Sequence, residues 1–200
     1  APYEMMQAML RTQPKPKWMN EYEFGEKAQL DKQIWELQKK TYDYEMFEGL
    51  LYATDIPLEE AVAFTLKWLD FTNVEHHTDT DKQDITFEYN GIKALVEVEG
   101  TIKASDKGKV QQLAGWLTQE IEGGRRVEEL QGFLVVNHYR EKNPSERGDP
   151  LTPHAKQFLK FNRSRFFTTF FLFNIVKEVM NGLPKSEARR KVWEGETFGE

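Results

Sequence analysis

The sequence predicts an α/β fold with a central mixed β-sheet flanked by helices and preceded by a long N-terminal helix. Asn90-Gly91 separates two β-prone runs, a strong hairpin signal because both turn positions require a positive φ. The continuous apolar run from Gly132 to Asn137 is typical of a strand buried on both faces. From Lys107 to Ile121, apolar side chains fall on one face of a helix, as in a helix that covers a sheet.

The composition limits the class of protein. With 200 residues, of which 39% are hydrophobic, the chain suffices for one sizeable globular domain. No apolar run approaches the roughly 20 residues that a membrane-spanning helix needs, so we expect no membrane partner. The absence of cysteine excludes a disulfide scaffold, a zinc-cysteine site and thiol catalysis. No N-terminal signal pattern is visible, and we expect a cytoplasmic protein.

Charge is distributed unevenly along the chain. The net charge of -6 argues against a protein whose whole surface binds a polyanion. Residues 1–100 contain 10 Lys and Arg against 20 Asp and Glu, whereas residues 101–200 contain 17 and 13. A polyanion is therefore expected on the second half. Because the chain begins Ala-Pro rather than with Met, we expect a processed or shortened product, or a domain of a larger parent polypeptide.

The N-terminal region is expected to consist of an irregular lead-in and a long helix. Closely spaced Pro14 and Pro16 predict that residues 1–22 are irregular. Within residues 23–52, mainly apolar side chains recur at helical spacing. This stripe consists of Leu30, Ile34, Leu37, Thr41, Tyr44, Glu48 and Leu51. The helix either packs on its own domain or forms a homodimer or interdomain contact, and the two polar members of the stripe weaken a coiled coil.

Residues 53–183 are expected to form the main domain, and residues 184–200 a polar tail. Its first helix should run from about residue 55 to 68, because carboxylates in the first turn complement the helix dipole. A strand is expected at residues 71–75. The adjacent His76 and His77 that follow would point to opposite faces, so we expect structural or solvated side chains rather than metal ligands.

The two-residue hairpin loop fixes a register that brings three carboxylates together. It pairs Tyr89 with Ile92, Phe87 with Ala94, Ile85 with Val96, and Asp84 with Glu97. Opposed residues share a face, and Glu99 projects from the face of Glu97. Three carboxylates on one face repel one another, which a hard cation such as Mg²⁺ or Mn²⁺ would offset. The alternative is an exposed sheet face on which acidic residues alternate.

The second half of the chain supplies the remaining elements. A polar loop at residues 101–106 precedes the helix over residues 107–121, and the strand at residues 132–137 precedes a charged, proline-containing loop. We then expect a helix at about residues 154–162, a short strand at residues 165–167 and a last helix that ends at Asn181-Gly182. The Phe-rich stretch over these last elements is expected to pack in the core rather than to stack on bases.

The order helix, strand, acidic hairpin, helix, strand, with the motif Asp84…Glu97-x-Glu99, resembles the PD-(D/E)xK nuclease superfamily, which has the restriction-endonuclease-like fold (αβββαβ). In more detail, residues 45–182 resemble a widespread group of uncharacterised restriction-endonuclease-like domains. The shared blocks are Leu50-Leu51-Tyr52, Pro57-Leu58-Glu59, Ala61-Val62, Trp68-Leu69-Asp70-Phe71, Asp84-Ile85, Val96-Glu97-Val98-Glu99-Gly100, Gln112-Leu113, Trp116, Gly132-Phe133-Leu134-Val135-Val136-Asn137, Pro144, Glu146-Arg147 and Thr168-Thr169.

The resemblance implies a site for Mg²⁺, or Mn²⁺, and roles for its residues. Asp84 and Glu97 would bind the metal with help from the Val98 carbonyl, and Glu59 would lie near the site. Gln112 would position the attacking water or a phosphate. The remaining motif position, normally Lys, is Glu99 in this sequence.

Glu99 leaves two interpretations open. A glutamate serves as general base if a second metal or neighbouring groups supply the positive charge. Without a cation beside the phosphate, the domain would instead be catalytically inactive and would bind nucleic acid or a protein partner within a larger assembly. The first interpretation is a Mg²⁺-dependent nuclease that hydrolyses DNA. The residues expected to contact DNA are Lys103, Lys107, Lys109, Arg140, Arg147, Lys156 and Lys160.

Overall fold

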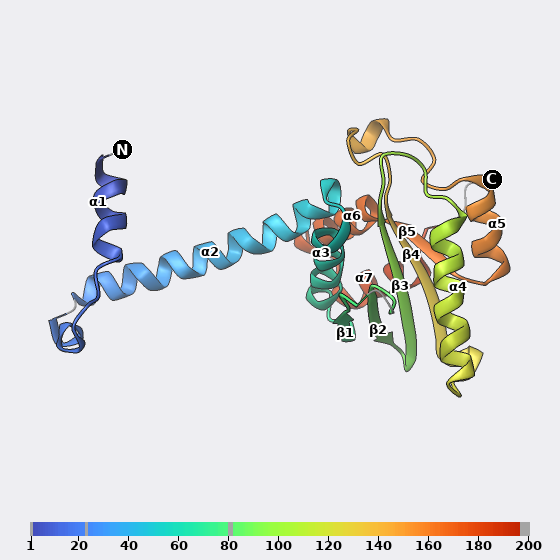
Figure 1. Cartoon of the computed structure of the whole chain (residues 1–200), viewed down its shortest axis with the longest axis horizontal. Helices are drawn as coiled ribbons and strands as arrows, with labels where there is room; N and C mark the ends of the chain where they lie inside the picture. Colours follow the sequence, from blue (N-terminus) through green and yellow to red (C-terminus); the bar gives the residue numbers. More distant parts are fainter. Residues whose placement is uncertain (1, 23, 80–81, 197–200) are drawn as a thin grey trace. The chain divides into compact units, whose positions relative to one another are not determined.

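The computed structural model describes the chain except for residues 1, 23, 80, 81 and 197–200 (Figure 1). The chain divides into two compact units, residues 1–42 and 43–200. One long helix, α2 (Gly25–Tyr52), contributes to both units. No helix among the described residues is long and apolar enough to cross a membrane.

The first unit contains helical structure where an irregular lead-in was expected. It consists of α1 (Pro2–Arg11), the 3-10 helix η1 (Lys17–Tyr22) and the N-terminal part of α2. The residues of α1 are mostly good helix formers and precede Pro14 and Pro16, so the prolines separate α1 from η1 rather than prevent helix formation. None of the residues of α1 is buried.

The second unit is built on a five-stranded mixed sheet, which confirms the predicted fold class. The strands lie in the order β1 (Thr72–His76), β2 (Ile85–Tyr89), β3 (Ile92–Gly100), β4 (Leu130–Asn137) and β5 (Arg165–Thr168). The first three strands are antiparallel, and β3, β4 and β5 are parallel. Asn90 and Gly91 have φ angles of 52° and 77°, and β2 pairs with β3 in the predicted register.

Helices cover both faces of this sheet (Figure 1). On one face, a core that includes Leu66, Phe87 and Phe133 lies under α3 (Asp55–Trp68), α6 (Thr169–Met180) and α7 (Lys185–Glu194). On the other, Leu95 and Leu134 pack against α4 (Lys107–Glu122) and α5 (Pro153–Phe161). Two short 3-10 helices, η2 (Val127–Glu129) and η3 (Pro144–Glu146), lie in the connections.

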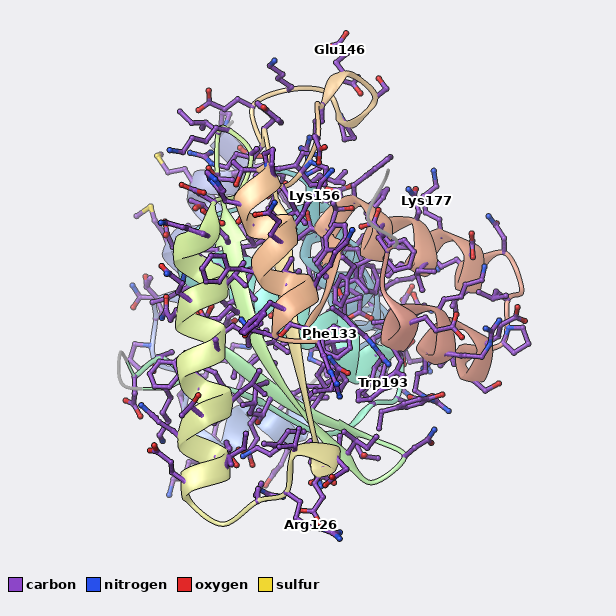
Figure 2. The ribbon with its side chains drawn as sticks, turned by 90° about the vertical axis from the view of Figure 1, so that its right-hand side faces the viewer. Arg126, Phe133, Glu146, Lys156, Lys177 and Trp193 are labelled. Atoms are coloured by element: carbon purple, nitrogen blue, oxygen red, sulfur yellow. The ribbon has the colours of Figure 1, made fainter. Side chains whose placement is uncertain are left out.

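Helix α7 occupies a region that was expected to be a polar tail. Ala188 and Val192, one helical turn apart, are fully buried. Trp193 contacts Phe133 with a centroid distance of 5.4 Å, and the two rings lie close together in Figure 2. The polar composition of this segment therefore conceals a narrow apolar face that completes the core.

Both edges of the sheet are modified. The register of β1 shifts between Thr72 and Glu75, so a bulge interrupts this edge strand. At the other edge, the backbone N–H of Glu196 donates to the carbonyl of Phe166 in β5 at 2.8 Å, and the Glu196 carboxylate accepts from the N–H of Thr168. The segment after α7 thus lies along β5.

Candidate functional site

The start of β2 and the end of β3 bring the predicted carboxylates to one place. Asp84 lies immediately before β2, and its Oδ2 accepts a hydrogen bond from the backbone N–H of Val98 at 2.7 Å. Glu97, the residue before Val98, is fully buried. It lies on the same face of β3 as Leu95, which α4 covers.

Glu97 receives two hydrogen bonds from α4, one of them from a charged side chain. The Nζ atom of Lys109 lies 3.0 Å from Oε2 of Glu97, and Nε1 of Trp116 donates to Oε1 at 2.6 Å. Lys109 and Trp116 are two helical turns apart and therefore face the same strand. Both oxygens of the buried carboxylate are hydrogen-bonded, as burial of a charge requires.

The site carries more negative charge than its neighbours neutralise. Burial, followed by the charge of Asp84, raises the pKa of Glu97 to about 7 despite the opposing effect of Lys109. Burial also raises the pKa of Asp84, which the hydrogen bond from Val98 partly opposes. Burial by itself would lower the pKa of Lys109, but the charges of Glu97 and Asp84 raise it.

Glu99 is directed toward the loop that precedes α4. Its Oε2 accepts a hydrogen bond from the hydroxyl of Ser105, a fully buried residue. The backbone N–H of Ser105 donates to the carbonyl of Pro150 at 2.8 Å. Asp106 then caps α4 by accepting from the N–H of Lys107. Glu99 therefore helps to fix the position at which α4 begins.

Glu59 joins the site from α3 together with a histidine. Its Oε2 lies 2.9 Å from Nε2 of His76 in β1, and both side chains are largely buried. The charges of Glu59 and His76 both affect the pKa of Asp84. His76 is thus an ordered member of this cluster. The expectation of a structural or solvated role did not anticipate this position beside Asp84.

The predicted DNA contacts differ in what their side chains do. Lys103, in the loop that follows β3, and Lys107, the first residue of α4, are both exposed. Lys156 pairs with Asp149 at 2.6 Å. Arg147 donates to the carbonyls of Leu51 and Lys142 and to Oδ1 of Asn137. Arg140 lies in the loop between β4 and η3, and Lys160 lies on α5. The remaining residue of the set, Lys109, binds Glu97.

Gln112 lies on α4 between Lys109 and Trp116, and it is exposed. It makes no hydrogen bond to the site carboxylates within the described part of the chain. The sequence predicted the carboxylates but missed their partners Lys109 and Trp116. The seven-residue spacing of these two on an amphipathic helix that follows the acidic strand is the signal that indicates them.

The donor set fits a hard divalent cation. Asp84 and Glu97 provide carboxylate oxygens, and Mg²⁺ favours oxygen ligands of this kind. The ammonium of Lys109 bonds Glu97, and the charge of Asp84 also acts on it. Oδ1 of Asp84 has no hydrogen-bond partner among the described residues. The same residues include no cluster of three or more His, Cys, Asp or Glu already arranged around a metal position. Asp84 and Glu97 could hold such a cation through their carboxylates.

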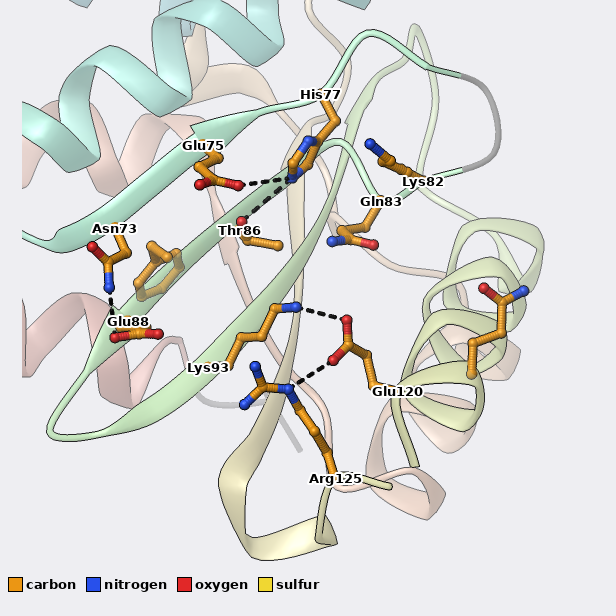
Figure 3. Close-up of a pocket in the computed structure, with 12 residues that line it drawn as sticks. Asn73, Glu75, His77, Lys82, Gln83, Thr86, Glu88, Lys93, Glu120 and Arg125 are labelled. Carbon is orange, nitrogen blue, oxygen red and sulfur yellow. Dashed lines mark hydrogen bonds and ion pairs between the residues drawn. The ribbon is translucent and has the colours of Figure 1, made fainter. Parts of the chain in front are cut away.

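A polar pocket of about 470 Å³ opens next to this site (Figure 3). Gln83, the neighbour of Asp84, lines it together with residues of β1, β2, β3 and α4. Its charged side chains pair with one another: Glu120 lies 2.6 Å from Lys93 and 3.0 Å from Arg125. Lys93 is thereby directed away from Glu97, toward the far end of α4.

Among solved structures, the chain is similar to the restriction endonuclease FokI, with a TM-score of 0.53 and 14% identity over 78% of this chain and 31% of that chain. FokI bound to DNA gives a TM-score of 0.51 and 14% identity over 78% and 30%. A repair endonuclease from Pyrococcus abyssi covers 52% of this chain and 42% of that chain at 16% identity, with a TM-score of 0.37. The chain spans about a third of the length of the FokI chains. No protein-family model and no curated protein sequence matches it.

Proposed function

From the restriction-endonuclease-like fold of this chain, we propose that it is a Mg²⁺-dependent nuclease that hydrolyses phosphodiester bonds in DNA. The observation that carries the proposal is the buried Glu97 beside Asp84, with a lysine at its carboxylate. A buried cluster of this kind is costly for folding and is typical of a site whose charges are used in chemistry.

The proposed roles follow from where the side chains lie. Asp84 and Glu97 would hold the metal with the Val98 carbonyl, and Glu59 would add negative charge from α3. When bound, Mg²⁺ supplies a Lewis acid for the phosphate oxygens and lowers the pKa of water. Glu99 would accept the proton of the attacking water as general base, and its charge acts on the nearby ammonium of Lys109.

DNA is the proposed substrate. The exposed Lys103 and Lys107 flank the carboxylates and would contact backbone phosphates. Gln112, exposed on the same helix, would orient the water or a phosphate oxygen. Arg140, Arg147, Lys156 and Lys160 would extend this contact, and the guanidinium of Arg147 is held in place by three hydrogen bonds within the protein.

Cleavage assays with matched variants test the proposal. The protein should cut DNA in Mg²⁺ or Mn²⁺ and not in chelator, and Asp84→Asn should reduce the rate by at least a hundredfold. Glu122→Gln, an exposed substitution on α4, is the matched control and should cut normally. Absence of cleavage of DNA and RNA in both metals, or equal cleavage by Asp84→Asn, would refute a nuclease.

The hydrogen bond from Ser105 to Glu99 favours a second candidate, an inactive domain of this fold that binds nucleic acid or a protein partner. In this alternative Glu99 only anchors the loop before α4. Calorimetry separates the two candidates, because a nuclease should bind Mn²⁺ and lose that binding in Glu97→Ala. DNA binding without heat from Mn²⁺ would support the inactive domain.

We also propose that α2 joins two copies of the chain. Leu30, Ile34 and Leu37 of the predicted stripe are all at least half exposed. Their spacing of four and three residues is that of a helix seam, which buries such side chains against a second helix.

A further inference from the structure

We propose that Lys109, from α4, supplies the positive charge at the scissile phosphate that position 99 lacks. This inference rests on the proposed nuclease function and assigns the lysine that completes its site. Lys109 would contact a phosphate oxygen beside the metal and stabilise the negative charge that develops as water attacks.

The contacts of Lys109 place its ammonium among the carboxylates. Nζ lies 3.0 Å from Oε2 of Glu97, and the charges of Asp84 and Glu99 also act on it. Its side chain remains 31% exposed, although Glu97 is fully buried. The side chain of Lys109 therefore bonds Glu97 while part of it stays accessible, and the three N–H donors of its ammonium suffice for Glu97 and a phosphate oxygen together.

The nearby lysines that flank the motif in sequence do not take this place. Lys93 binds Glu120 at 2.6 Å, and Lys103 is exposed in the loop before α4. Among the described residues, Glu97 forms one ion pair, and its partner is Lys109. A lysine is suited to the task because its ammonium is a compact point charge on a flexible stem.

The surroundings of Lys109 fix its position. Trp116 binds Oε1 of Glu97, which leaves Oε2 for Lys109. Ser105, held by Glu99, and the cap Asp106 fix the start of α4, and Lys109 lies in its first turn, three residues after Asp106. The acidic residue at the motif position thus helps to deliver the lysine from another element.

Substitutions at Lys109 test the inference. Lys109→Met keeps the length of the side chain without its charge and should reduce cleavage by 10²- to 10³-fold. Lys109→Arg keeps the positive charge and should retain more activity than Lys109→Met. This comparison separates the effect of the charge from an effect on folding. Lys177→Met, an exposed lysine on α6, should behave as the wild type.

Binding provides a readout independent of cleavage. In Ca²⁺, Lys109→Met should weaken the binding of a DNA duplex severalfold relative to Lys177→Met, while Mn²⁺ binding should be retained or tightened. Wild-type cleavage that survives Lys109→Met would overturn the role of Lys109 and leave the nuclease intact. If the wild type cuts nothing, the proposed function fails. Equal duplex binding by the two Met variants would then overturn the role of Lys109 as a phosphate contact as well.

Discussion

At the scale of single residues, the chemistry centres on one buried carboxylate. Glu97 has both oxygens bonded, to Lys109 and Trp116, yet burial and Asp84 keep its pKa near 7. A hydrophobic residue in its place would cost the fold less. Retaining a charge there makes sense for a site that binds a cation.

The pKa of Glu97 predicts how stability depends on pH. Because its folded pKa of about 7 lies above the ordinary value of 4.5, the folded protein binds the proton more tightly than the unfolded chain. This contribution, up to about 3 kcal/mol, is present below pH 4.5 and is lost as pH rises through 7. With a chelator present, the free energy of unfolding of the wild type should fall between pH 5 and 8. That of Glu97→Gln should not show this fall.

Glu122→Gln, on the exposed side of α4, serves as the control and should follow the wild type at each pH. Parallel stability curves for wild type and Glu97→Gln would contradict the assigned pKa. Added Mg²⁺ should stabilise the wild type more at pH 8 than at pH 5, because the ionised carboxylate is the metal ligand.

Trp116 should contribute to stability through its indole N–H. Trp116→Phe removes the donor to Glu97 and should lower the free energy of unfolding by about 1.5–3 kcal/mol, the usual range for hydrogen bonds to charged groups. Trp35→Phe, on the exposed part of α2, should change it by less than about 0.5 kcal/mol. Denaturant titration of both variants makes the comparison, and equal values would show that the indole bond contributes nothing.

At the scale of elements, the acidic hairpin was the most predictable part of the chain. The turn Asn90-Gly91 determines the register locally, and β2 and β3 follow it. The partners Lys109 and Trp116 were harder to foresee, because they depend on how α4 lies across β3. That packing joins residues distant in sequence, which periodicity alone cannot assign. Helix α7 was missed because its composition is mostly polar.

Gly91, in the turn before β3, and Gly100, the last residue of β3, should respond differently to substitution. Gly91→Ala meets no atom within 4 Å but requires a positive φ, which should cost about 1 kcal/mol. A Cβ on Gly100 would lie 2.8 Å from the Cα of Thr54, so Gly100→Ala must move backbone and should cost about 2 kcal/mol or more. Urea denaturation ranks the two, and the reverse order would contradict the close approach at Gly100.

At the scale of the whole molecule, the two units expose different surfaces. The second unit has two apolar cores, whereas the first has apolar and aromatic side chains on its surface, including Tyr3, Met6 and Trp18. Exposed apolar surface of this extent is typical of an interaction region. The uneven charge seen in the sequence lies within the second unit, where the acidic residues 43–100 precede the basic half that contributes α4, α5 and their loops.

Association through α2 can be tested by mass. Ile34→Glu combined with Leu37→Glu places two charges on the stripe and should halve the mass measured by sedimentation equilibrium. Lys39→Glu in the same helix is the control for added negative charge. A wild type that is monomeric at all concentrations would exclude this seam as a dimer contact.

The modified edges of the sheet affect how molecules of this protein can associate with one another. An unprotected outer strand is a template on which another chain can polymerise. Here the bulge in β1 disrupts one template, and the segment at Glu196 shields β5. We therefore expect that neither edge of the sheet adds strands from other copies to form fibrils. Self-association is then confined to helical contacts and stops at a defined size.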